Sequence, residues 1–204
     1  WVSGDVRNQS DHPEHMFVRR LGASLAAHVR ATFSFSDGRL LFVDPRRFGT
    51  IRLLATREAC EPAGVDPLSS VLTAKHLMVL SGRSSQEAKV WLMRQDRLVG
   101  IGNIYASEAL FRANIHPKRP MSSLSPAEFL RLHRSLRFIL RKAIAACGTT
   151  FSDFQDTTGS LGGYGRYLAV YGREGEHCRR CQVGTIERCV QAQRSTFFCA
   201  NCQT

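Results

Sequence analysis

The sequence of 204 residues predicts a multidomain α+β chain with three consecutive parts: a strand region, a helical region and a hairpin that carries four cysteines. Three observations predict this order. Apolar and polar residues alternate from about residue 29, which is the pattern of a half-buried strand. Apolar residues then recur with a helical period, and two C-x2-C pairs lie near the end. The predicted domains are 1–58, 66–155 and 166–204.

The composition favours a globular protein that binds a polyanion. The apolar and charged fractions, 43% and 22%, are typical of folded chains. Lys and Arg number 28 against 17 Asp and Glu, and the resulting net charge of +11 suits nucleic acid as the partner. A basic protein without such a partner is the alternative. No apolar run approaches the roughly 20 residues of a membrane helix, so we expect no membrane partner.

The strand region is expected to follow a polar stretch, residues 1–27, that has the composition of a loop. Alternation predicts a strand over 29–35, and Asp37-Gly38 is a strong signal for the hairpin turn after it. A returning strand, a turn with the sequence DPRRFG and a further strand are expected next, at 40–43, 44–49 and 51–54.

Helical periodicity begins after a linker that contains proline and glycine, residues 57–70. The longest helix has a clear start signal, because Ser125 suits an N-cap, Pro126 suits the first helical position and Glu128 completes a capping box. Gly148 is expected to end it. Its arginines are interpreted first as a solvated face and secondarily as phosphate contacts. Four helices are predicted, near 71–80, 85–93, 104–113 and 126–147.

A glycine-rich segment, residues 155–166, is predicted to be a flexible loop. After it come Cys178 and Cys181, then seventeen residues, then Cys199 and Cys202. Each pair can turn two thiolates onto one ion, and the interval is long enough for a β-hairpin. Four cysteine ligands predict one structural, tetrahedral zinc. A redox-active C-x-x-C motif is the less favoured alternative.

Three stretches together resemble the formamidopyrimidine-DNA glycosylase family of bacterial base-excision enzymes. They are DPRRFG at 44–49, GIGNIYASEALFRANIHP at 100–117, and the cysteine-rich end at 170–203. The resemblance covers about residues 28–203. It implies a partial N-terminal β-sandwich, a helix-two-turn-helix domain, a loop at 155–166 that covers the lesion, and a C-terminal zinc finger. It also implies a monomer in the bacterial cytoplasm, associated with the nucleoid.

The activity implied by the resemblance is removal of oxidised purines, such as 8-oxoguanine and formamidopyrimidines, from double-stranded DNA. The strand is then cut at the abasic site by β,δ-elimination. The family's nucleophile is an N-terminal proline amine followed by a glutamate, and neither these nor the family's catalytic lysine has a match in this sequence. Pro13-Glu14 is the one Pro-Glu pair, and it is internal. We therefore expect a fragment that performs no base excision by itself.

The resemblance assigns three residues of DPRRFG to the opened duplex. Arg46 would enter the space left by the flipped base and bond to the widowed cytosine. Phe48 would wedge into the base stack beside it, and Arg47 would hold a phosphate. A wedge and a guanidinium recover part of the free energy that unstacking costs.

Four further residues are assigned by the resemblance. Lys89 and Asn103 would grip the phosphates around the lesion, although Asn103 without the resemblance is interpreted as a helix N-cap. His28 matches the second histidine of a pair next to DNA. Arg194, expected at the turn of the hairpin, would bind phosphate and assist the second elimination step.

Two other functions remain as alternatives. One is the sister group of glycosylases that act on oxidised pyrimidines, which generally lacks the Arg-x-Phe spacing of DPRRFG. The other is a non-catalytic protein that binds damaged DNA with the same basic residues and zinc finger.

Overall fold

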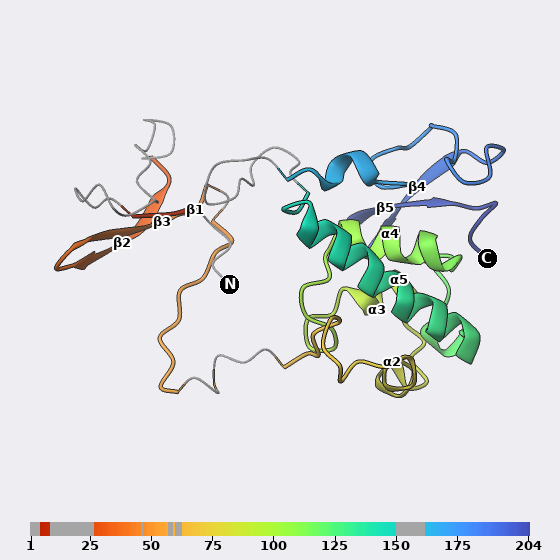
Figure 1. The fold of residues 1–204 in the computed structure, drawn as a ribbon, viewed down its shortest axis with the longest axis horizontal. Coiled ribbons are helices and arrows are strands. Elements are labelled where there is room, and N and C mark those ends of the chain that lie inside the picture. The colour runs from red at the N-terminus through yellow and green to blue at the C-terminus, as the bar shows by residue number, and fades with distance from the viewer. Residues whose placement is uncertain (1–4, 9–26, 46, 57–58, 60–62, 150–161) are drawn as a thin grey trace. The chain divides into compact units, whose positions relative to one another are not determined.

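A computed structural model describes residues 5–8, 27–45, 47–56, 59, 63–149 and 162–204. The chain divides into two compact units, one formed by residues 1–59 with 149–162 and the other by 60–148 with 163–204. Figure 1 shows strands in the first unit, and helices followed by a two-stranded hairpin in the second. Strand, helical and hairpin regions therefore occur in the predicted order.

The first unit contains a three-stranded antiparallel sheet with the strand order β1-β3-β2. The strands are β1 (Asp5–Asn8), β2 (Val29–Phe35) and β3 (Gly38–Val43). β2 and β3 confirm the predicted hairpin. β1 was not expected, because it lies in the stretch predicted to be a loop, and its backbone pairs with the central strand β3.

Two details of the strand prediction are wrong. Phe35 pairs with Gly38, so the hairpin loop consists of Ser36 and Asp37, and Gly38 already belongs to the returning strand. Residues 51–54 are not a strand. Their alternation has no sheet to match, because no described strand pairs with them and the Leu53 side chain is fully exposed.

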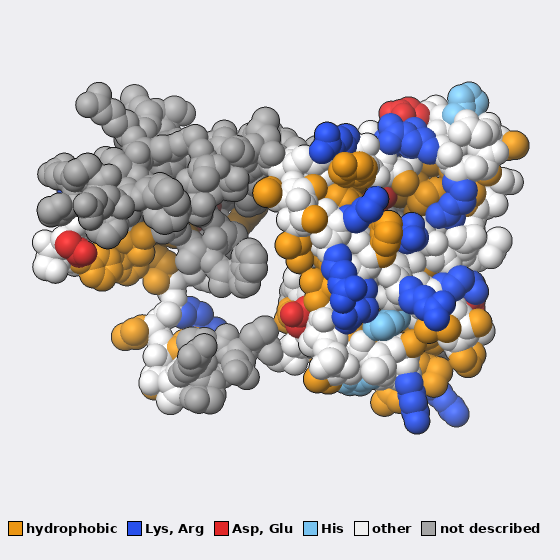
Figure 2. Space-filling model, in the orientation of Figure 1, with side chains coloured by type: hydrophobic (Ala, Val, Ile, Leu, Met, Phe, Trp, Pro, Cys, Tyr) orange, Lys and Arg blue, Asp and Glu red, His pale blue; other side chains and the backbone are white. Residues whose placement is uncertain are grey.

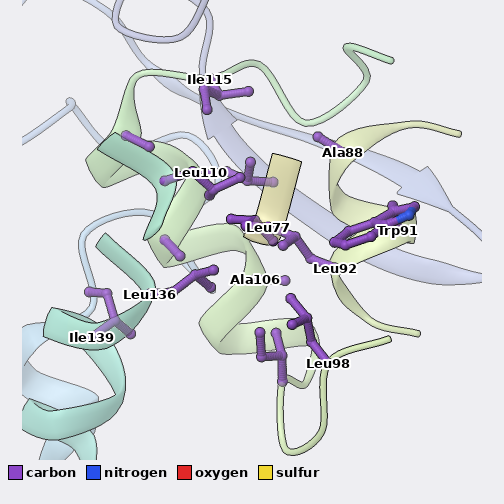
Figure 3. Packing of buried hydrophobic residues seen from close by; sticks show 14 of the residues in the cluster. Leu77, Ala88, Trp91, Leu92, Leu98, Ala106, Leu110, Ile115, Leu136 and Ile139 are labelled. Carbon is purple, nitrogen blue, oxygen red and sulfur yellow. The ribbon is translucent and has the colours of Figure 1, made fainter. Parts of the chain in front are cut away.

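The second unit is built from four helices and a hairpin. Their bounds are α2 (Ala74–Ser81), α3 (Ala88–Leu92), α4 (Asn103–Ala113), α5 (Pro126–Ala145), β4 (Ile186–Gln191) and β5 (Arg194–Cys199). Short 3-10 helices lie at Met121–Ser123 and Tyr164–Tyr167. Side chains from all four helices meet in one core, as Figure 3 shows for Leu77, Trp91, Leu110 and Leu136.

The start of α5 agrees with the sequence prediction, whereas the helix ends at Ala145, two residues early, because Cys147 with a φ of 57° already adopts the left-handed conformation expected of Gly148. Ser125 and Glu128 form a reciprocal capping box, and Pro126 is the first helical residue. The Arg119 guanidinium hydrogen-bonds Glu128 and lowers the pKa of this carboxyl to about 2. Beyond the other end, the Gly148 N–H donates to the Ala143 carbonyl at 2.8 Å, with the glycine in the left-handed region.

Helices α2 and α3 begin three residues later than predicted. For α2 the reason is local, since the Thr73 side chain caps the helix by accepting a hydrogen bond from the His76 N–H. For α3 the reason is tertiary, since Glu87 pairs as an isolated β-bridge with Pro120 and is therefore held in extended backbone. Among the described residues, no helix is both long and apolar enough to cross a membrane.

The hairpin packs on α4 through a second, smaller apolar cluster. This cluster contains Phe111 of α4, Ile186 of β4 and Phe197 of β5. Two of the four cysteines, Cys178 and Cys199, belong to it and are fully buried. Loss of the hairpin's own structure would therefore also expose one face of α4.

Candidate metal centre and nucleic-acid interface

The four predicted cysteine ligands come together at the base of the hairpin. Their sulfur atoms all lie within 4.8 Å of one another. The Sγ–Sγ distance is 3.8 Å between Cys178 and Cys202 and 3.9 Å between Cys181 and Cys199. A tetrahedral ion with metal–sulfur bonds of about 2.3 Å requires sulfur atoms about 3.8 Å apart. The four cysteines are therefore spaced to bind one metal ion.

The electrostatics of this cluster also favour a bound cation. Burial, together with hydrogen bonds that the Cys202 thiol donates to the other cysteines, raises the pKa of Cys202 to about 12, and burial also raises the pKa of Cys199. The N–H groups of Gly184 and Val183 lower the pKa of Cys181 to about 6. Four thiolates at this distance repel one another, so a cation is required to hold all of them deprotonated.

Gly184 leaves the space that this cluster needs. A Cβ atom added there would lie 2.9 Å from the Cys199 Sγ and 3.4 Å from the Cys181 Sγ. We expect Gly184→Ala to spread the sulfur atoms and lower metal affinity about 10-fold or more, as loss of supporting groups does at other metal sites. Competition with a chromogenic chelator measures this affinity. Gly165→Ala, where an added Cβ meets no atom within 4 Å, is the control, and equal affinities in the two variants would contradict the prediction.

The turn of the hairpin has a strained backbone and is followed by an exposed arginine. Ala192 and Gln193 connect β4 to β5 with φ angles of 45° and 60°. Residues other than glycine rarely adopt this left-handed backbone conformation. Arg194 follows directly and is exposed. Arg194 therefore lies where the sequence predicted it, next to the turn.

Lys89 is fully buried, which its position on α3 alone did not predict. Its Nζ donates to the Ser195 carbonyl at 3.0 Å and to the Thr196 Oγ1 at 2.7 Å. Burial lowers the pKa of Lys89 to about 8, while Cys189 raises it and Arg194 lowers it. The ammonium group is thus held against the strand that begins with Arg194.

Asn103 meets the same strand from α4. Its Nδ2 donates to the Ser195 carbonyl at 2.9 Å and to the Tyr171 hydroxyl at 3.1 Å. The interpretation of Asn103 as an N-cap is wrong, because Gly102 occupies that position and the Asn103 side chain turns to the hairpin. Its Oδ1 is buried and has no hydrogen-bond partner among the described residues. Lys89 and Asn103 therefore converge on one carbonyl, beside Arg194.

Glu108 is a residue that the sequence argument missed. Its carboxylate is buried and accepts hydrogen bonds of 2.9 Å from the N–H groups of three consecutive residues, Ala169 to Tyr171. Burial raises the pKa of Glu108, while these N–H groups oppose that shift. By fixing the backbone of Tyr171, Glu108 positions the hydroxyl that holds Asn103. Its signal in the sequence was a carboxylate within a helix face that is otherwise apolar.

The turn DPRRFG, in the first unit, is closed by a buried aspartate. The Asp44 Oδ2 accepts from the Gly49 N–H at 2.7 Å, and a Cβ at Gly49 would lie 3.0 Å from the same oxygen. Arg47 has a φ of 57°, and the Phe48 side chain is 82% exposed. The turn thus holds Phe48 away from the core, as an insertion wedge requires.

The structure describes less of the surroundings of two predicted residues of the first unit, Arg46 and His28. Arg46 lies outside the described residues. His28 is half-buried and accepts at its carbonyl from the Asp44 N–H, and its Nδ1 has no hydrogen-bond partner among the described residues. Their roles remain predictions.

The fold and the site define a class: a helix-two-turn-helix protein that ends in a four-cysteine hairpin. Residues 63–155 match the family model described as the formamidopyrimidine-DNA glycosylase H2TH domain. The chain is 44% identical over 182 residues to formamidopyrimidine-DNA glycosylase of Laribacter hongkongensis, covering 86% of this chain and 66% of that protein. It is 39% identical over 192 residues to that of Klebsiella pneumoniae, covering 91% and 71%.

Solved structures show the same similarity. MutM (Fpg) of Thermus thermophilus matches with a TM-score of 0.79 and 35% identity, covering 99% of this chain and 73% of that one. Lactococcus lactis Fpg in complex with DNA containing an abasic site matches with a TM-score of 0.79 and 30% identity, covering 98% and 72%. The chain belongs to the formamidopyrimidine-DNA glycosylase family. It spans 66% of the length of the relative from Laribacter hongkongensis.

Proposed function

We propose that the chain is the DNA-binding part of a bifunctional glycosylase and lyase in base-excision repair. Its substrate is double-stranded DNA that contains oxidised purines or abasic sites, and the complete reaction removes the base and cuts the strand by β,δ-elimination. The observation that carries this proposal is the convergence of Lys89, Asn103 and Arg194 at the tip of the hairpin. Membership of the formamidopyrimidine-DNA glycosylase family supports the same function.

We propose zinc as the ion of the four cysteines, because a closed set of four thiolates is its usual structural site. The ion would hold Cys178, Cys181, Cys199 and Cys202 together and so fix the base of the hairpin. The chain's own residues supply the DNA contacts. The protein would act as a monomer in the bacterial cytoplasm, associated with the nucleoid through its net charge of +11.

The phosphate contacts follow from the positions of the donors. Lys89 and Asn103 hold the Ser195 carbonyl from below, so a phosphate arriving at the exposed Arg194 would meet its guanidinium on a rigid frame, with the positive charge of the buried Lys89 ammonium behind it. In the first unit, Phe48 and Arg46 would fill the space of the flipped base, Arg47 would hold a phosphate, and His28 would lie beside the DNA. Arg194 would also assist the second elimination.

Damage-specific binding tests this function. We expect the chain to bind a duplex with an abasic-site analogue about 10-fold more tightly than the undamaged duplex, because the missing base lowers the cost of opening the stack. Phe48→Ala should remove this preference and leave undamaged binding unchanged, and the exposed Leu53→Ala is the matched control. Equal affinity for the two duplexes would contradict the proposal. Borohydride trapping on DNA with an abasic site distinguishes a lyase, which forms a covalent adduct, from a non-catalytic binder.

The pKa of Lys89 predicts a pH dependence of DNA binding. A phosphate beside Lys89 favours the charged ammonium, so the complex takes up a proton above about pH 8. The logarithm of the affinity should then fall as pH rises from about 8, by at most one unit per pH unit. Fluorescence anisotropy at constant salt measures this change, and Lys89→Met should remove it.

The titration of Lys89 does not destabilise the folded chain as pH rises, so unfolding through Lys89 cannot explain a fall in DNA affinity. Because the pKa of Lys89 is lower in the folded chain than its ordinary value of 10.5, the unfolded chain binds more protons between pH 8 and 10.5. The contribution of Lys89 to the free energy of unfolding therefore rises with pH in this window. Parallel pH profiles for the parental chain and Lys89→Met would contradict the assignment of Lys89 to a phosphate.

A further inference from the structure

A second basic surface lies on the outer side of α5. We define the α5 face by six exposed side chains: Arg112, Arg134, Phe138, Arg141, Lys142 and Tyr167. Four of them occupy positions 134, 138, 141 and 142 of α5, a spacing that places them on one side of a helix. Figure 2 shows Lys and Arg side chains gathered on the visible face of the second unit.

The cations of the α5 face have no acidic partners among the described residues. Within the part of the chain that the structure describes, Arg112, Arg134, Arg141 and Lys142 form no ion pair. The sequence from 129 to 152 contains five Lys or Arg residues and no Asp or Glu. By contrast, Arg137 on the same helix donates to three backbone carbonyls, those of residues 67 to 69. The positive charge of the α5 face is therefore not neutralised by these residues. The Arg137 guanidinium, in contrast, is occupied in holding the backbone of residues 67 to 69.

The aromatic rings of the α5 face hold cations in place. The Arg112 guanidinium lies 3.5 Å from the centre of the Phe138 ring. The Lys142 ammonium lies 5.1 Å from the same ring centre and 5.3 Å from that of Tyr167. These cation–π contacts order long side chains that would otherwise move freely on the surface. They also cover ring surface on which an apolar side chain or an unpaired base could stack.

The α5 face is separate from the hairpin tip. Arg112 is in the last turn of α4, whereas Asn103 is its first residue. Nine residues are two and a half helical turns, so the two side chains leave α4 on opposite sides and lie about 13.5 Å apart along the axis. One duplex segment held by Lys89, Asn103 and Arg194 therefore leaves the cations around Phe138 available.

We propose that the α5 face binds a second segment of double-stranded DNA, without sequence preference. Ordered cations without acidic neighbours match the phosphates of a duplex. An acidic protein segment fits less well, because such interfaces use apolar anchors and a cation already lies over each ring here. Single-stranded DNA fits less well for the same reason, since it requires free ring faces for stacking. A chain that holds two duplex segments can pass from one to the other without release into solution.

Energy transfer between two short undamaged duplexes tests this proposal. One duplex carries a donor fluorophore, the other an acceptor, and both exceed the protein in concentration. We expect energy transfer with the parental chain and a stoichiometry of two duplexes per protein chain by sedimentation. Arg134→Gln/Arg141→Gln should abolish energy transfer and reduce the salt slope of total binding by about 1.8, since each lost phosphate contact contributes about 0.9. Lys75→Gln/Lys118→Gln removes two exposed charges elsewhere and is the matched control.

Three outcomes would overturn the proposal: no energy transfer with the parental chain, equal energy transfer in the two double variants, or two duplexes bound only by a protein dimer. Binding of an oligoglutamate peptide to the parental chain in place of the second duplex, lost in Arg134→Gln/Arg141→Gln, would assign the face to an acidic protein. Failure of the hairpin site gives a different result, namely one bound duplex whose affinity depends on Arg134 and Arg141 and not on Lys89.

Discussion

Cys199→Ser should release about one equivalent of metal and unfold the hairpin. Cys199 is the last residue of β5 and is fully buried within the four-sulfur cluster. A serine in its place removes one ligand and leaves three thiols close together. Structural zinc supplies folding free energy on the order of 10 kcal/mol. Because Lys89 and Asn103 both bond to Ser195 of the hairpin, the affinity for duplex DNA should fall with the metal content.

Elemental analysis and fluorescence anisotropy measure these two effects. Cys147→Ser is the control, since Cys147 is exposed and lies outside the cluster. It should keep both the metal and the DNA affinity. A Cys199→Ser protein with unchanged metal content would show that the four cysteines are not the ligands.

Glu108→Ala should destabilise the second unit by about 3 kcal/mol. The substitution leaves the N–H groups of Ala169, Val170 and Tyr171 without their acceptor. A hydrogen bond to a charged group contributes about 1.5–3 kcal/mol to stability. Burial raises the pKa of Glu108, so part of this stabilisation is already offset. The Tyr171 hydroxyl should then lose its fixed position beside Asn103, and DNA affinity should decrease.

Urea unfolding measures the change in free energy. Glu176→Gln is the matched control, because Glu176 lies near the same segment and pairs with Arg173 through an exposed carboxylate. Such pairs contribute about 0–1 kcal/mol. Glu108→Gln should be intermediate, since its amide oxygen can still accept while its amide nitrogen cannot. A Glu108→Ala protein as stable as Glu176→Gln would show that the carboxylate has no structural role.

Features determined by residues close together in the sequence were predictable. The start of α5 depends on Ser125, Pro126 and Glu128, which act within one helical turn, and the structure confirms it. The four-cysteine cluster depends on two local C-x2-C pairs and one hairpin, and the sulfur positions confirm it.

Features that depend on distant contacts were not predictable in this way. Lys89 is buried because the hairpin covers it, and nothing in α3 indicates that contact. Asn103 has the composition of a cap, but its side chain bonds to a strand far along the chain. Residues 51–54 have a strand's alternation, yet a strand also requires a partner, and no described strand supplies one.

The contact between Lys89 and Ser195 has a consequence for the order in which the protein becomes active during synthesis. It joins residues 106 positions apart, and pairings over such distances form late because closing a long loop costs conformational entropy. A ribosome adds about 5–20 residues per second, so several seconds separate the appearance of Lys89 from that of Ser195. During this interval the helices can fold around their own core, but the lysine has no hairpin to hold it. The phosphate contact proposed for Lys89 and Arg194 therefore becomes possible only when the last residues of the hairpin have left the ribosome.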